Sequence, residues 1–167
     1  MAIEHEYFGI IDETASGGLA WSESADLADQ VVEVELLADD ESAVPEFAVN
    51  AAAALIQALE GFDARARDAL IAELSSQASA TVGYIDEHVD KLGDDLVDLL
   101  VHNSGDIAVD VLRSLQLLQV VIQPDHSDEE EVFATFDYSI SPDDTDALLV
   151  VSFDIRGDVV NVDTHQP

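Results

Sequence analysis

Four aspartates at a spacing of four residues are the side chains in this sequence best placed to do chemistry together. They are Asp86, Asp90, Asp94 and Asp98. They line one face of a helix only if that helix continues through Gly93. Such a strip would bind the Lys and Arg side chains of a protein partner, or a cation. The alternative is a solvated face in a chain that is acidic throughout, with Gly93 breaking the alignment.

A second acidic run is predicted to join two strands. It consists of Asp128, Glu129, Glu130 and Glu131. Its oxygens suit a hard cation, but calcium loops space their ligands around a central Gly, and no such motif occurs here. The run therefore favours a charged hairpin loop that discourages edge pairing. We predict the Asp strip and this acidic run as the two surfaces that engage a basic partner.

The histidines are scattered, and no two of them have the helical spacing of a metal site. We therefore predict neither a metal site nor a cofactor. No nucleophile elbow, phosphate-binding Gly loop or dinucleotide fingerprint is present. An enzyme would need two or more of His88, Asp137 and Asp146 in one cleft. Because His88 is expected on an acidic helix surface, we predict no catalytic residue, with a hydrolase-type enzyme as the alternative.

The charge is unusual for a chain with this much apolar content. The formal net charge is -32, from 5 Lys and Arg against 37 Asp and Glu, while 48% of the residues are hydrophobic. This balance predicts a folded acidic protein that binds neither nucleic acid directly nor an anionic membrane. A cell living in concentrated salt and a GC-rich genome both explain the composition, and both interpretations stay open.

Length and the absence of cysteine also limit what the chain can do. The 167 residues fit one domain over residues 1–167, and without Cys there is no disulfide or thiolate chemistry. The first residues lack the features of a signal peptide, and no apolar run reaches the ~20 residues of a membrane span. We therefore expect a cytoplasmic location.

The period of the apolar residues changes from two to 3.6 and back along the chain. We expect strands at 6–11, 19–24 and 30–36, and again at 118–122, 132–140, 147–155 and 160–162. Between them we expect a helix from Pro45 to Gly61 with Phe47 on its apolar stripe. A second helix is capped by Asp63 and bends or breaks at 75–79. Short helices follow near 96–100 and 107–115. The order predicts an α+β fold: N-terminal antiparallel strands, central helices and a C-terminal antiparallel meander.

Both ends of the chain resemble a bacterial family of uncharacterised domains. Residues 136–140 (Phe-Asp-Tyr-Ser-Ile), the pair Thr145-Asp146 and the strand 148–154 are similar to the family's ending. Residues 5–9 (His-Glu-Tyr-Phe-Gly) resemble its start, with an aromatic-Gly pair in the first strand. The family is domain of unknown function two-thousand-four. The resemblance implies the same α+β arrangement and no established activity.

These observations predict a non-enzymatic acidic binding or accessory protein that engages a basic protein partner. Small α+β proteins of this kind also resemble immunity proteins that neutralise toxins, a likeness of fold alone. The alternatives are the hydrolase-type enzyme described above and a fold with no discrete site. The lone Trp21 is expected to pack in the core or at a sheet edge.

Stability should depend on salt because so many carboxylates share one chain. We expect the melting temperature to rise between 0.01 M and 0.1 M sodium chloride, as the Debye length falls from ~30 Å to ~10 Å and self-repulsion is screened. Differential scanning calorimetry would measure this. A melting temperature that stays constant would mean that the charges are locally compensated.

Overall fold

The computed structural model describes residues 3–27, 30–100, 104–128 and 131–165. The strands are β1 (Ile3–His5), β2 (Gly9–Glu13), β3 (Leu19–Leu27), β4 (Gln30–Ala38), β5 (Gln116–Ile122), β6 (Ala134–Ser139), β7 (Leu148–Phe153) and β8 (Val159–His165). The α-helices are α1 (Glu46–Gln57), α2 (Leu59–Ala72), α3 (Ala80–Leu92), α4 (Asp94–Leu99) and α5 (Ile107–Ser114). Short 3₁₀ turns η1 (Glu41–Ala43) and η2 (Glu73–Ser75) precede α1 and follow α2. The predicted α+β class is confirmed.

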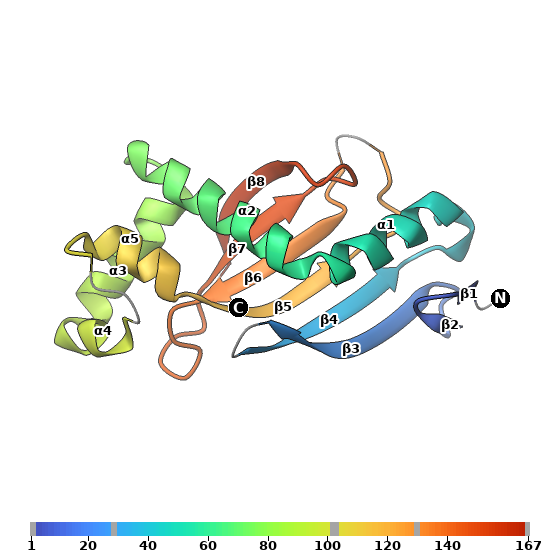
Figure 1. The fold of residues 1–167 in the computed structure, drawn as a ribbon, viewed down its shortest axis with the longest axis horizontal. Helices are drawn as coiled ribbons and strands as arrows, with labels where there is room; N and C mark the ends of the chain where they lie inside the picture. Colours follow the sequence, from blue (N-terminus) through green and yellow to red (C-terminus); the bar gives the residue numbers. More distant parts are fainter. Residues whose placement is uncertain (1–2, 28–29, 101–103, 129–130, 166–167) are drawn as a thin grey trace.

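All of these strands belong to one sheet, in the order of the sequence from β1 to β8. Neighbouring strands are antiparallel except β4 and β5, which are parallel and pair Val34 with Val120. Parallel neighbours require a crossover connection, and here the chain passes through all of its α-helices between them. In Figure 1, α1 and α2 lie across one face of the sheet, and α3, α4 and α5 gather beyond one end.

The core lies between the sheet and the helices, and strand alternation sets which side chains enter it. On β4, Val32, Val34 and Leu36 are almost fully buried, whereas Glu33 is exposed on the other face. This is the alternation that the sequence predicts. The remaining core side chains come from strands at both ends of the chain and from each of the helices α1 to α5. The hydrophobic effect therefore holds the two halves of the sheet and the helices together.

The helix breaks follow the predicted signals in part. The predicted break at 75–79 is confirmed, and Ser79 caps α3 by accepting a hydrogen bond from the backbone N–H of Val82 (3.2 Å). Gly93 ends α3 with a φ of 54°, a conformation that favours glycine. The predicted cap at Asp63 is wrong, because α2 begins at Leu59 and continues through Gly61. Gly61 is not among the glycines with positive φ, so it does not end the helix in the way that Gly93 does.

Two further expectations need correction. The predicted strand 6–11 is instead a hairpin, in which residues 6–8 turn and Gly9, with a φ of 68°, starts β2. Phe47, expected on the buried stripe, is 60% exposed, whereas Ala48 and Val49 in the same turn are buried, because the face of α1 that meets the core is offset from the predicted stripe. The apolar period predicts that a helix buries one face, but it does not predict the burial of every residue near the end of that helix.

A partly buried polar network fixes α2 against α5 and the sheet. The Nε of Arg67 donates to both carboxylate oxygens of Asp63 (3.1 and 3.2 Å), and Nη1 and Nη2 donate to the carbonyl oxygens of Leu112 (3.1 Å) and Leu115 (2.9 Å). The guanidinium also lies 5.2 Å from the ring centroid of Tyr138, on β6. The hydroxyl of Tyr138 donates to Asp63 (2.6 Å). Burial, reinforced by the Asp63 carboxylate, raises the pKa of Tyr138 far above its usual range, so this phenol stays a donor.

Removing the guanidinium should destabilise the fold. We expect Arg67→Met to lower the free energy of unfolding by ~2–4 kcal/mol, because Asp63 and the α5 carbonyls lose their donors where water reaches them poorly. Tyr138→Phe should cost ~1–2 kcal/mol, for one hydrogen bond to a charged group. Urea denaturation would measure both. Arg113→Met, at an exposed arginine on α5, is the matched control and should change stability by less than ~0.5 kcal/mol.

Candidate functional site

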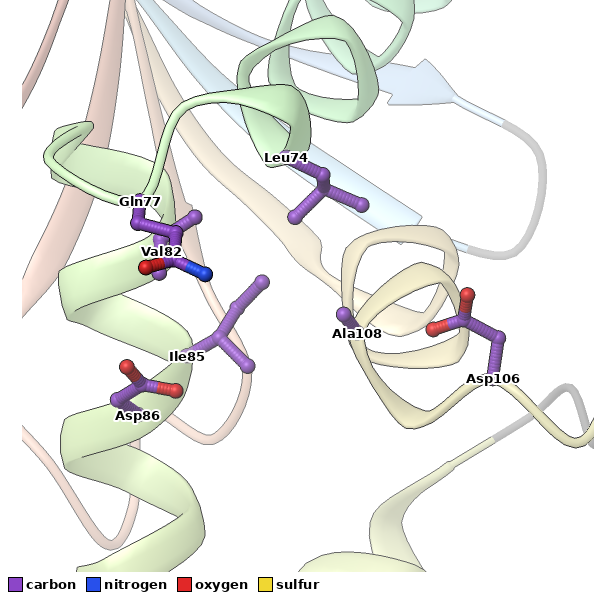
Figure 2. A pocket seen from close by; sticks show the side chains of 7 residues that line it. All are labelled: Leu74, Gln77, Val82, Ile85, Asp86, Asp106 and Ala108. Carbon is purple, nitrogen blue, oxygen red and sulfur yellow. The ribbon is translucent and has the colours of Figure 1, made fainter.

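A groove between α3 and α5 is the strongest candidate for a binding site. Its volume is about 560 Å³, within the range of about 300–1,000 Å³ of ligand pockets. It is lined by Leu74, Gln77, Val82, Ile85, Asp86, Asp106 and Ala108. Figure 2 shows Leu74, Ile85 and Ala108 pointing toward the same space from the end of η2, from α3 and from α5.

Hydrogen bonds at the helix starts hold the groove open. Ser79, which begins α3, also donates through its hydroxyl to the carbonyl of Glu73 in η2 (3.0 Å). On the other wall, Asp106 caps α5 by accepting from the backbone N–H of Val109 (3.3 Å). The buried Asp110 accepts from the backbone N–H and the hydroxyl of Ser104, which fixes the segment leading into α5. Both walls are therefore anchored by side chains before any ligand arrives.

The groove combines an apolar floor with carboxylates at its rim. Leu74, Val82 and Ile85 provide the floor, and Asp86 and Asp106 add negative charge. Val89 lies one turn beyond Ile85 on the same helix face and is 38% exposed, so the apolar surface continues along α3. Such a surface suits side chains that carry a cation on an apolar stem, as Lys and Arg do.

The structure divides the predicted Asp strip between two helices. Asp86 and Asp90 lie on α3, whereas Asp94 and Asp98 lie on α4, and all four are exposed. Because Gly93 ends α3, they do not share one helix face, and the alternative in which Gly93 breaks the alignment is correct. Asp86 is the member of the strip that lines the groove.

The acidic run lies away from the groove. Asp128 is exposed and Glu131 is half-buried, while Glu129 and Glu130 lie outside the described residues. The run follows the C-terminal end of β5, whereas α5 leads into the N-terminal end of that strand. Seven strand residues therefore separate the two regions by roughly 20 Å.

The three candidate acid-base residues are not brought together. Contrary to expectation, His88 is 1% exposed, because its ring nitrogens bond the Tyr84 carbonyl (2.7 Å) and the Thr145 hydroxyl (3.0 Å). Asp146 is exposed, and Asp137 lies on the face of β6 opposite the core residues. No hydrogen bond or ion pair joins any two of the three in the described part of the chain. His88 instead holds the loop after β6 against α3.

Within residues 3–27, 30–100, 104–128 and 131–165, no group of three acidic or histidine side chains is placed to hold a metal ion. No helix in these same ranges is long and apolar enough to cross a membrane. No family model, curated protein or solved structure matches this chain. The resemblance of the chain's two ends to a family of uncharacterised domains therefore stays a prediction.

The sequence pointed to part of the groove without revealing it. Leu74, Val82 and Ile85 recur at helical spacing within the stretch predicted as the second helix, and such a spacing indicates a buried helix face. The break at 75–79 was the signal that this stripe would be divided between two elements. Ala108 was not predicted, because nothing in the local pattern of α5 indicates which helix lies opposite it.

Asp137 is a half-buried carboxylate on the sheet face away from the core. Cross-strand register places Gln119 and Val150 beside it, and burial raises its pKa, while the charge of His165 acts in the opposite direction. Because its folded pKa is higher than its unfolded pKa, the ionised form costs stability as pH rises through the folded value. The side chain is therefore a source of pH-dependent stability.

We expect Asp137→Asn to raise the melting temperature at pH 7, because a neutral amide costs less to bury than a carboxylate. The gain should vanish below the ordinary Asp pKa of 3.8, where the carboxyl is protonated in both states. Asp163→Asn, at an exposed carboxylate on β8, removes the same charge and is the matched control. Equal effects of both variants at pH 7 would mean that total charge, not burial, is responsible.

Proposed function

We propose that this chain is a non-enzymatic binding or accessory protein that engages a basic protein partner in the groove between α3 and α5. The observation that carries the proposal is an apolar floor beside Asp86 and Asp106, in a chain with a net charge of -32. An acidic surface alone would attract any cation. The apolar floor adds a requirement for shape and hydrophobic side chains, which selects among basic partners.

The chemistry of the groove defines the segment that it would accept. An amphipathic helix with apolar anchors and flanking Lys or Arg fits both the floor and the rim. The negative electrostatic field of the whole chain would raise the association rate with a basic partner, and added salt would lower that rate. A stable interface buries roughly 800 Å² on each partner, so the contact extends beyond the groove. The exposed Asp90 on α3 and Asp94 and Asp98 on α4 are the proposed extension.

One specific form of this function is that of an immunity-type protein. Such a protein covers the active surface of a basic toxin or of a nucleic-acid-binding protein. The acidic run from Asp128 to Glu131 is the proposed second contact for a partner large enough to reach it. A cytoplasmic location and membership of the family of uncharacterised domains accompany the proposal. The hydrolase alternative has less support, because His88 is buried, Asp146 is exposed and Asp137 lies on the sheet face away from the core.

Two groove variants test the proposal. Ala108→Trp fills the groove without changing charge, and Asp86→Lys reverses the charge at the rim. We expect each to lose a basic protein that the wild type retains from a native lysate. We also expect Asp86→Lys to slow association with that protein at least ~10-fold at low salt, measured by surface plasmon resonance.

The matched control is Glu60→Lys, which makes the same charge change at an exposed position near the start of α2, roughly 20 Å along that helix from η2. A protein lost from this variant as fully as from Asp86→Lys would show that only total charge matters. A protein retained by Ala108→Trp would show that the groove is not the contact. Either result would contradict the proposed function.

A further inference from the structure

The N-terminal hairpin holds a cluster of aromatic rings against β3. The ring centroids of Phe8 and Trp21 are 4.7 Å apart in an edge-to-face arrangement, and those of Tyr7 and Phe8 are 5.0 Å apart. Phe8 is 7% exposed and anchors the cluster, whereas Tyr7 is 39% exposed and Trp21 is half-buried. Trp21 packs at the edge of the core, as expected, but it and Tyr7 also keep accessible ring surface.

Tyr7 and Trp21 are among the residues that line a small cavity between the N-terminal hairpin, β3, β4 and α1. The volume is about 140 Å³, and the lining residues are Tyr7, Trp21, Glu23, Ser24, Ala25, Val34 and Ile56. Val34 and Ile56 are at most 9% exposed and form an apolar floor. Drug-sized ligands need at least about 300 Å³, so the cavity has room for one compact group.

We propose that this cavity binds a methylated ammonium group. The faces of Trp and Tyr rings attract cations, and quaternary ammonium groups are recognised in this way because they carry little tightly held water. Val34 and Ile56 offer the apolar contact that methyl groups require, which a hydrated sodium ion does not use. The carboxylate of Glu23 adds a negative charge at the same cavity.

The hairpin is tied to α1, so the cavity is preformed. The imidazole of His5 accepts from the backbone N–H of Tyr7 at Nδ1 (3.1 Å), and its Nε2 bonds Oδ1 of Asn50 on α1 (2.7 Å). These bonds fix the backbone of Tyr7 in the hairpin and tie the hairpin to α1. Tyr7 also lines a second cavity of about 400 Å³, which has room for the rest of the molecule that carries the cation.

Trp21 is the only tryptophan, so its fluorescence reports on the cavity directly. We expect tetramethylammonium chloride to change this fluorescence saturably, with half-saturation on the order of 1–10 mM, at constant ionic strength against sodium chloride. Choline and a peptide carrying trimethyl-lysine should behave in the same way. The tighter of these two identifies the source as a free small molecule or as a protein side chain.

Two variants separate the ring contact from the charge. Tyr7→Leu keeps an apolar cover but removes the ring, and Glu23→Gln keeps the shape but removes the carboxylate. Each should weaken tetramethylammonium binding at least ~5-fold, whereas Glu60→Gln, which removes a distant charge, should change it less than ~2-fold. Glu23 is exposed, so Glu23→Gln keeps the test valid if Tyr7→Leu does not fold, which circular dichroism would show.

The proposal is overturned by either of two results. In the first, sodium chloride changes the fluorescence as much as tetramethylammonium does. In the second, Glu23→Gln and folded Tyr7→Leu titrate like the wild type. Because the cavity lies on β3, β4 and α1, both results are independent of the groove between α3 and α5.

Discussion

The fork of Arg67 is the interaction on which the arrangement of the helices depends. A lysine could not replace it, because three guanidinium nitrogens held in one plane donate at once to a carboxylate on α2 and to carbonyls at the end of α5. The only lysine of the chain, Lys91, is exposed on α3. Since Arg67 sets where α5 ends relative to α2, it also sets the position of the wall that carries Ala108. The groove is thus held by a contact outside it.

Most of the negative charge is kept in water, and the two fully buried aspartates of the described residues have hydrogen-bond donors. Asp110 is held by Ser104, and the buried Asp154 accepts from the backbone N–H groups of Arg156 and Asp158 in the turn before β8. The exposed carboxylates create a negative electrostatic field that attracts any cation. Specificity arises where apolar or aromatic side chains lie among the carboxylates. The groove combines carboxylates with aliphatic side chains, and the Tyr7–Trp21 cavity combines a carboxylate with aromatic ones. The first suits an amphipathic segment and the second a methylated cation.

The sequence predicted features that depend on neighbours within one element. The alternation of β4, the break at 75–79 and the end of α3 at Gly93 all follow from local periodicity and backbone preference. What it did not predict depends on distant partners. Asp63 looked like a helix cap, but Tyr138 and Arg67 hold it inside α2. His88 looked like a surface residue, but Thr145, far along the chain, completes its hydrogen bonds. The parallel pairing of β4 with β5 could not be predicted either, because no local sequence pattern indicates which strand lies beside β4.

That parallel pair has a consequence for how the chain is made. When β4 leaves the ribosome, its partner has not been synthesised, because every α-helix comes before β5. During that interval the N-terminal hairpins expose an open strand edge, and pairing across such a long separation forms slowly. The same carboxylates that surround the finished protein, including Glu33 and Glu35 on β4 itself, would repel a second nascent copy from that edge. The acidic side chains can thus prevent strand pairing between two nascent copies before the protein has folded.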